Sequence, residues 1–300
     1  MVLKDIKKGI AVLCGMAVLG ISVTGCGGGG GSSVTSPLEK DGVVIDSSNS
    51  EQVINTVFNV MDVGSDLALP SLKSVGETSA PTSVITQPAT LKQIESSVLA
   101  RNEAVAGEPI YCTDGGYITL TDTGMIFSNC NESGMIMDGT VTASGNETAA
   151  TMTLSNFTMT LDNEIAFYES LTYSFTTNAN YEINSMSITM DGYTNIFGER
   201  TEYQNYTFTM NMNDLSVISF SVNGLIKTDC LGAWIEIRTV ENIQINDVDP
   251  CPTAGKIVIN GNASGITVDF NSDGSVNVSG SVTDYYSSCL SLPGDTCSIL

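Results

Sequence analysis

The chain has 300 residues and is strongly acidic, with 33 acidic against 11 basic side chains and a formal net charge of −22. Because like charges repel, this balance excludes nucleic acids and anionic lipid surfaces as partners of the folded body. Histidine is absent from the sequence, which excludes Ser-His-Asp and Cys-His catalysis and histidine-ligated zinc or haem.

The N-terminus has the pattern of an export signal. Lys4, Lys7 and Lys8 precede an apolar run over residues 10–23. This run is too short to cross about 30 Å of hydrocarbon as a permanent helix, so we expect a signal peptide over residues 1–25 rather than a membrane span.

The end of this run, Val23-Thr24-Gly25-Cys26, places two small residues between an aliphatic residue and a cysteine. It resembles the lipobox of bacterial lipoproteins, and the resemblance covers residues 1–26 alone. It implies that Cys26 becomes the N-terminus, carries acyl chains and holds an exported protein on a membrane. Gly27 at the next position favours the outer membrane, with the body on its periplasmic or surface face. An ordinary cleaved signal with an unmodified cysteine is the alternative.

The segments that follow differ in composition. Residues 26–45 are a Gly/Ser-rich linker. Residues 46–105 are predicted to be helical around a Pro-rich loop, with one helix over about 50–67 and a second over about 90–104. The first has apolar residues at helical spacing, namely Val53, Ile54, Val57, Phe58 and Met61.

Residues 106–300 are predicted to form an antiparallel β domain. Short runs of alternating polar and apolar residues, such as Tyr117–Thr121, are rich in Thr, Ile, Val, Tyr and Phe. Turns are predicted at Asp138-Gly139, Ser144-Gly145-Asn146, Asp191-Gly192, Asn223-Gly224 and Asp273-Gly274. One face of the strands is mostly Thr, Ser and Asn. We therefore expect a mainly β (α+β) fold: a large curved antiparallel sheet or open barrel, with two N-terminal helices packed on its apolar face.

Six cysteines remain beyond Cys26, and an even number in an exported protein indicates disulfides. They are Cys112, Cys130, Cys230, Cys251, Cys289 and Cys297. Six cysteines allow 15 pairings, and proximity in the chain suggests Cys112–Cys130, Cys230–Cys251 and Cys289–Cys297. The sequence contains no Cys-x-x-Cys pair, so a metal or redox site is not favoured.

Several weaker patterns also have simpler interpretations. Asp269, Asn271 and Asp273 match the start of a calcium loop, but its twelfth position holds Gly280 rather than Glu, so a hairpin turn is favoured and no metal is assigned. Asp247 and Asp249 form a second candidate oxygen cluster, for which a solvated loop is favoured. Trp234, Tyr285 and Tyr286 are candidates for stacking a sugar, although packing is the commoner role. Glu164, Glu169 and Glu182 are candidates for a carboxylate pair, without a spacing that supports one.

These patterns favour a non-enzymatic, membrane-anchored envelope lipoprotein with a structural or interaction role and no cofactor. Its partners would be the membrane, through the lipid on Cys26, and envelope proteins. The main alternative is a binding or carrier module that holds an apolar ligand between the sheet and its helices. A hydrolase that uses carboxylates is the third possibility.

Overall fold

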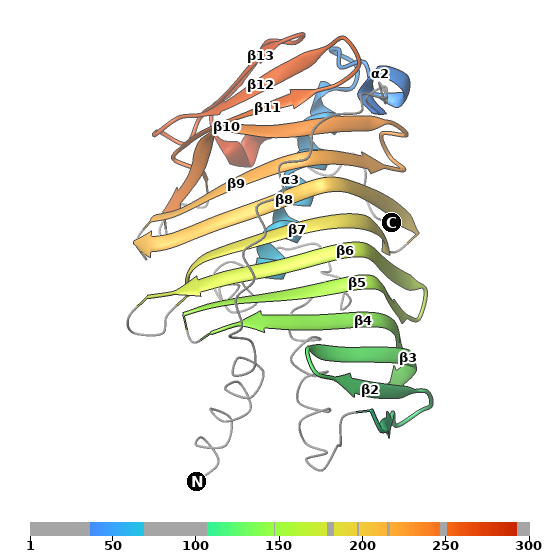
Figure 1. Ribbon diagram of the computed structural model, residues 1–300. Helices are drawn as coiled ribbons and strands as arrows, with labels where there is room; N and C mark the ends of the chain where they lie inside the picture. The colour runs from blue at the N-terminus through green and yellow to red at the C-terminus, as the bar shows by residue number, and fades with distance from the viewer. Residues whose placement is uncertain are drawn as a thin grey trace, which may run out of the picture.

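The computed structural model describes residues 37–68, 107–146, 148–178, 183–196, 198–214, 217–246 and 251–292. Within these ranges, fourteen strands form one antiparallel sheet in which each strand pairs with its neighbours in the sequence (Figure 1). The strands are β1 (Pro109–Tyr111), β2 (Tyr117–Thr121), β3 (Gly124–Glu132), β4 (Met135–Gly145), β5 (Ala149–Leu161), β6 (Glu164–Thr177), β7 (Ile183–Ile196), β8 (Glu199–Asp214), β9 (Val217–Thr228), β10 (Trp234–Asn246), β11 (Ala254–Asn260), β12 (Gly265–Phe270), β13 (Val276–Gly280) and β14 (Asp284–Tyr286). The sheet is not closed, because β1 and β14 are its two edges.

The long helix α3 (Ser50–Ala68) agrees with the predicted first helix. The expectation of two helices on the sheet is not borne out, since the described residues place only α3 there. The short helix α2 (Pro37–Asp41) lies beside β10, and residues 90–104, where the second helix was predicted, are outside the described ranges. No helix in the described part of the chain is both long and apolar enough to cross a membrane.

Alternation along the strands gives the sheet two different faces. The apolar face carries the buried side chains, among them Phe157, Leu171 and Ile188, and α3 lies across it behind β7 to β9 in Figure 1. The helix contributes Val53, Ile54 and Val57 to this core. Burial of this stripe is the main force that holds α3 in place, at about 25 cal/mol per Å² of apolar surface.

Specific contacts fix where the helix lies. The Tyr206 hydroxyl of β8 donates a buried hydrogen bond of 3.0 Å to the Val60 carbonyl. Phe58 meets Phe270 of β12 edge to face, with ring centroids 5.9 Å apart. Gln52 donates to the Cys230 carbonyl oxygen at 3.0 Å. The helix is therefore attached to strands far apart in the sheet.

A line of β-bulges crosses the sheet. Between Phe127 and Cys130, β3 has one residue more than the facing part of β4, and β5, β6, β8 and β10 carry similar extra residues. Glycines with positive φ face these bulges at Gly139, Gly192, Gly224 and Gly255. A Cβ on Gly192 would collide with the Phe167 carbonyl oxygen, so only glycine fits this approach of two backbones.

This bulge line corrects three predicted turns. Asp138-Gly139, Asp191-Gly192 and Asn223-Gly224 lie inside β4, β7 and β9, whereas the other two predicted turns do connect strands. The Asp191 carboxylate accepts a hydrogen bond of 2.6 Å from the amide of Asn205, a bulged residue with φ 49°. An Asp/Asn-Gly pair supplies the backbone freedom of a tight turn, and here that freedom accommodates a bulge instead.

Candidate functional site

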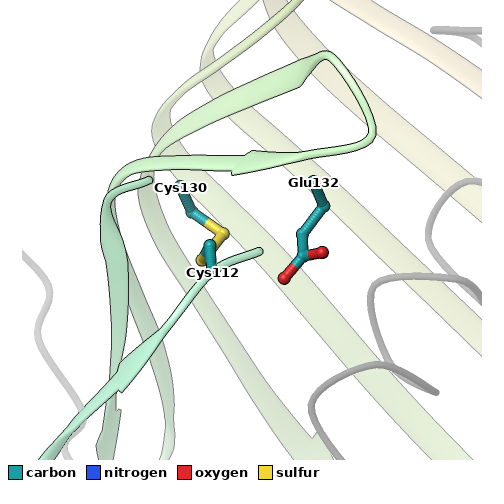
Figure 2. A group of neighbouring side chains, drawn as sticks. All are labelled: Cys112, Cys130 and Glu132. Carbon is teal, nitrogen blue, oxygen red and sulfur yellow. A yellow bond between two sulfur atoms is a disulfide. The ribbon is translucent and has the colours of Figure 1, made fainter. Parts of the chain in front are cut away.

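One group of metal-ligand side chains comes together in the described residues, and it is a disulfide beside a carboxylate. Figure 2 shows Cys112 and Cys130 bonded to each other next to Glu132. Sulfurs in a disulfide offer no thiolate to a metal. The two carboxylate oxygens of Glu132 accept hydrogen bonds from the Thr113 amide, at 3.1 Å, and the Thr113 hydroxyl, at 2.6 Å. The arrangement fits a structural role.

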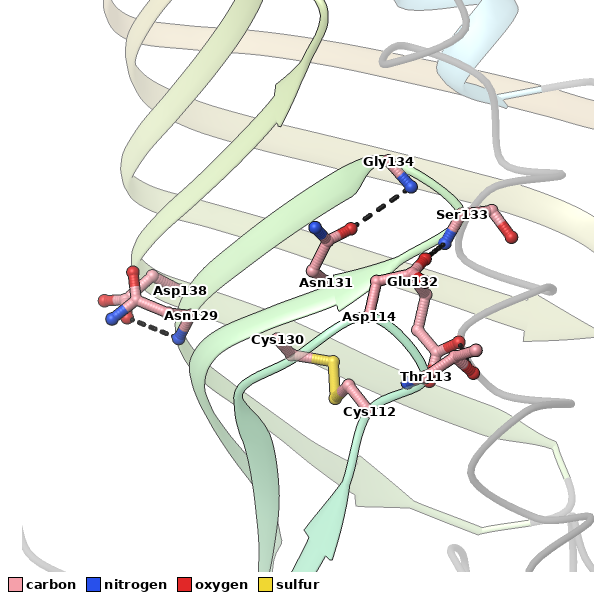
Figure 3. Close-up of a disulfide and its surroundings, with 10 residues drawn as sticks. All are labelled: Cys112, Thr113, Asp114, Asn129, Cys130, Asn131, Glu132, Ser133, Gly134 and Asp138. Atoms are coloured by element: carbon pink, nitrogen blue, oxygen red, sulfur yellow. Dashed lines mark hydrogen bonds between the residues drawn. A yellow bond between two sulfur atoms is a disulfide. The ribbon is translucent and has the colours of Figure 1, made fainter.

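Hydrogen bonds around the Cys112–Cys130 disulfide also support a structural role for this region (Figure 3). The Asp114 carboxylate accepts from the Ser133 amide at 3.0 Å, and the Asn131 side chain accepts from the Gly134 amide at 3.1 Å. The first contact fastens the loop before β2 to the β3–β4 hairpin, and the second closes the turn of that hairpin. The disulfide therefore secures the first edge of the sheet, as predicted for Cys112 and Cys130.

The other two predicted disulfides are wrong, because Cys251 is bonded to Cys289. Cys251 precedes β11, and Cys289 follows β14. The Cys289 amide donates to the carbonyl of Gly274, in the turn between β12 and β13. The meander thus brings residues separated by 38 positions to one end of the sheet. Cys230 is also disulfide-bonded, while Cys26 and Cys297 lie outside the described residues.

The side chains of the candidate calcium loop already bond to neighbouring residues of the protein. Asp269 forms an ion pair of 3.1 Å with Lys256 on β11. The Asp273 carboxylate accepts from the amide and hydroxyl of Ser275, which lowers the pKa of Asp273. Asn271 donates to the Ser275 hydroxyl at 3.0 Å. The three predicted oxygen ligands thus serve the β12–β13 hairpin and one cross-strand ion pair.

The structure does not bring the predicted stacking residues together. Trp234 is at the start of β10, and its carbonyl accepts from the Val43 amide. Tyr285 and Tyr286 are on β14, four strands away and at the opposite end of the strands, as the pairing through β11, β12 and β13 requires. Partial burial, and then the neighbouring Asp284, raises the pKa of Tyr286 to about 12. A shared sugar platform is therefore not formed.

The candidate carboxylate pair is also separated. Glu164 and Glu169 lie on β6, five positions apart, which is roughly 16 Å at about 3.3 Å per residue. Glycosidase carboxyl groups are about 5–9.5 Å apart. Glu182, Asp247 and Asp249 lie outside the described ranges. The described part of the chain thus gives no support to a Glu164–Glu169 acid/base pair.

The most regular surface feature of the described residues is the polar face of the sheet, which sequence reasoning identified only as solvated. Register places hydroxyl side chains in two parallel rows, called here the hydroxyl face. The first row is Thr142, Thr153, Thr172, Thr189 and Thr207, ending at Asn223; the second is Ser144, Thr151, Ser174, Ser187, Thr209 and Ser221. Adjacent members are about 4.7–4.9 Å apart across strands, and the rows are roughly 6.6–6.8 Å apart.

On the hydroxyl face, side-chain hydroxyls pair between every second set of neighbouring strands. Thr151 and Ser174 are 3.1 Å apart across β5 and β6, and Ser187 and Thr209 are 3.3 Å apart across β7 and β8. Side chains are closer at pairs that do not share backbone hydrogen bonds, and such pairs alternate from one boundary to the next. Neither row contains a charged residue, although the chain carries a net charge of −22. In the sequence, the Thr-x-Thr and Ser-x-Thr spacing is the pattern from which these rows could have been predicted.

Beneath the hydroxyl face, the apolar face changes character along the sheet. Buried methionines concentrate on β4 to β8, whereas β9 to β13 present mainly Ile and Val. The methionines are Met135, Met137, Met159, Met186, Met190, Met210 and Met212. Methionine is flexible and fills irregular spaces, while β-branched side chains are stiff. The half of the core under β4 to β8 is thus the more adaptable one.

Buried tyrosines add polar groups to the same region. The Tyr203 hydroxyl bonds to Thr194 and Thr201, and burial raises the pKa of Tyr203 to about 12. Tyr173 differs, because its buried hydroxyl has no hydrogen-bond partner among the described residues; Asn195 Oδ1 is in the same situation. Burial also raises the pKa of Tyr173, so this hydroxyl stays protonated at neutral pH.

No family model matches the chain, and no similar curated protein or solved structure was found.

Proposed function

We propose that this chain is a non-enzymatic lipoprotein of the cell envelope, anchored through Cys26 on the outer membrane, whose hydroxyl face contacts other envelope material. The observation that carries the proposal is the pair of uncharged rows across β4 to β9. The lipobox-like residues 23–26 and the Gly/Ser-rich linker suit a body tethered at a distance from a membrane.

The chemistry of the rows favours an uncharged partner rich in hydroxyl and amide groups. Each threonine or serine hydroxyl can donate one hydrogen bond and accept others. Such a surface gives no advantage to a charged ligand, and the acidic body repels anionic ones. Envelope glycans have the required density of neutral hydroxyl groups, so we assign a glycan as the partner of the hydroxyl face.

Co-sedimentation of the full chain with an insoluble neutral polysaccharide tests this function. The double variant Thr172→Val, Thr189→Val removes two central hydroxyls and keeps the side-chain shape. Since each net hydrogen bond contributes about 0.5–1.5 kcal/mol, retention should weaken about tenfold. The control Thr119→Val, Thr160→Val changes outward threonines beyond the rows and should bind normally. No retention of the unmodified chain, or equal retention of both variants, would contradict the proposal.

A second candidate function is that of a carrier for an apolar ligand held between the sheet and α3. The observation that favours it is the methionine-rich apolar face of β4 to β8, since surfaces of this kind repack around varied apolar ligands. Mass spectrometry of organic extracts from the purified chain tests this function, and a stoichiometric lipid is the expected result. A lipid-free chain that takes up no apolar probe would contradict it.

A further inference from the structure

Cys230 lies in the turn between β9 and β10, and its sulfur forms a disulfide. The other cysteines of the described residues are already joined to one another in two disulfides. The partner of Cys230 is therefore one of the cysteines outside the described ranges, namely Cys14, Cys26 or Cys297. The identity of this partner decides what is fastened to the β9–β10 turn and whether Cys26 is free to carry lipid.

The proposed export signal removes two of these candidates. Cys14 lies within the apolar run over residues 10–23, which leaves the protein with the signal peptide. The Cys26 sulfur carries lipid in the proposed lipoprotein, and a sulfur that carries lipid cannot also form a disulfide. Cys297 is then the one remaining cysteine that can pair with Cys230.

The β9–β10 turn holds the Cys230 sulfur in a defined position. The Leu231 amide donates a hydrogen bond of 3.2 Å to the Thr228 hydroxyl oxygen, and the Gly232 amide donates to the Thr228 carbonyl oxygen at 2.8 Å. The side-chain amide of Gln52, in the first turn of α3, donates to Cys230 Sγ at 2.9 Å. The bonded sulfur therefore lies where the turn meets the start of the helix.

The last described part of the chain lies on the same face of the sheet as this turn. Leu292 follows the short helix η2 (Cys289–Ser291) and packs against the apolar core. Leu231, the residue after Cys230, packs against this core as well. Cys297 is five positions beyond Leu292. The segment that carries Cys297 therefore begins on the face of the sheet against which the β9–β10 turn packs.

From these observations we infer that Cys230 forms a disulfide with Cys297, which fastens the end of the chain to the β9–β10 turn beside α3. The inference rests on the proposed lipoprotein function, because it requires that Cys26 carry lipid. Each of the two thiols loses one proton and one electron when the bond forms, and a protein disulfide of the oxidising envelope accepts them and is reduced to a dithiol. Cys26 is then the only cysteine of the mature chain without a disulfide partner.

This bond secures the second edge of the sheet. The closed loop runs from the β9–β10 turn through β14 and contains the Cys251–Cys289 disulfide within it. The edge strand β14 has 3 residues, so closure of the loop limits how far it can separate from β13. Because Gln52 contacts the Cys230 sulfur, the same bond also holds the start of α3 at the sheet.

Disulfide mapping of the full chain, exported and purified from a bacterial host without reductant, tests this inference. Free thiols are blocked with iodoacetamide, and the protein is cleaved after Lys and Arg and before Asp. Cys230 and Cys297 then fall in residues 229–238 and 295–300, which contain no other cysteine. Mass spectrometry should show these two peptides joined to each other and separated by reduction.

Two variants make the test specific. Cys297→Ser should leave the Cys230 thiol free, so that iodoacetamide modifies residues 229–238, while the two other disulfides form normally. The control Ser298→Ala changes the neighbouring residue and keeps the sulfur, so its Cys230 should stay unmodified. Lipid on Cys26 is measured from the mass of residues 26–40 and should be the same in both variants and in the unmodified chain.

The outcomes separate the disulfide from the lipid anchor. Cys26 is the competing partner, because α2 follows it in the chain and lies beside β10. Residues 229–238 joined to residues 26–40 would overturn both the inference and the anchor. A Cys230 that iodoacetamide modifies, in a chain with lipid on Cys26, would overturn the disulfide and leave the anchor standing. A Cys230–Cys297 bond in a chain without lipid would confirm the disulfide and overturn the anchor.

Discussion

Replacing Tyr173 with Phe should stabilise the protein, which is unusual for the loss of a buried polar group. A buried hydroxyl without a partner costs about 1–3 kcal/mol of desolvation, and phenylalanine keeps the ring in its contacts with Met152 and Ile188. We expect the free energy of unfolding to rise by about 1–2 kcal/mol. Urea denaturation with intact disulfides measures this change, and the denaturant dependence should stay constant.

Tyr206 provides the matched control for this prediction. Its hydroxyl is also buried, but it donates to the Val60 carbonyl at 3.0 Å. Tyr206→Phe should therefore lower the free energy of unfolding by about 1 kcal/mol, which separates the two variants by roughly 2–3 kcal/mol. If Tyr173→Phe and Tyr206→Phe destabilise the protein equally, the Tyr173 hydroxyl has a hydrogen-bond partner in solution, and the reasoning is refuted.

Three further predictions concern stability. Removing the Cys251–Cys289 disulfide with a double Ser variant should cost about 4 kcal/mol, against about 3 kcal/mol for Cys112–Cys130, because its loop is 38 rather than 18 residues long; equal losses in denaturant titrations would contradict the loop-length argument. Gly192→Ala should destabilise the protein by at least about 2 kcal/mol more than Gly198→Ala, because both positions have positive φ but only a Cβ at Gly192 meets backbone; similar thermal shifts would refute this. Hydrogen bonds from Ser275 lower the pKa of Asp273, so the stability they contribute is present above the unfolded pKa of about 3.9 and is lost as the pH falls through the lower, folded pKa. Asp273→Asn should flatten the acid limb of a stability–pH curve, and an unchanged limb would exclude this contribution.

The sequence predicts the class of fold because its signals are local. Helical spacing of apolar residues from Val53 to Met61 defines α3, and alternation defines β2 over Tyr117–Thr121 as observed. Strand length was harder to predict. The Asp191-Gly192 pair has the same residues as a hairpin turn, yet it continues through β7, because the neighbouring β8 supplies an extra residue to match it. Whether such a pair forms a turn or faces a bulge depends on the neighbouring strand, and the sequence of the pair itself does not contain this information.

The candidate sites show the same limit. The oxygen pattern from Asp269 to Asp273 identifies a polar turn, but the partner of Asp269 is Lys256 on another strand. Sequence alternation indicates a Thr-rich outward side, but the two aligned rows depend on pairing register. The free hydroxyl of Tyr173 has no sequence signal, since it is defined by the partners that its surroundings do not offer.

The bulge line also sets the phase of the side chains along each strand. On β8, Tyr203 and Tyr206 are both buried although they are three positions apart, because the bulge at Asn205 shifts the alternation by one residue. If β8 continued regularly through Asn205 without the bulge and kept its far part in register, Tyr203 would turn outward and Gln204 would enter the core. The bulges therefore keep the apolar side chains before and after each irregular position on the same face of the sheet.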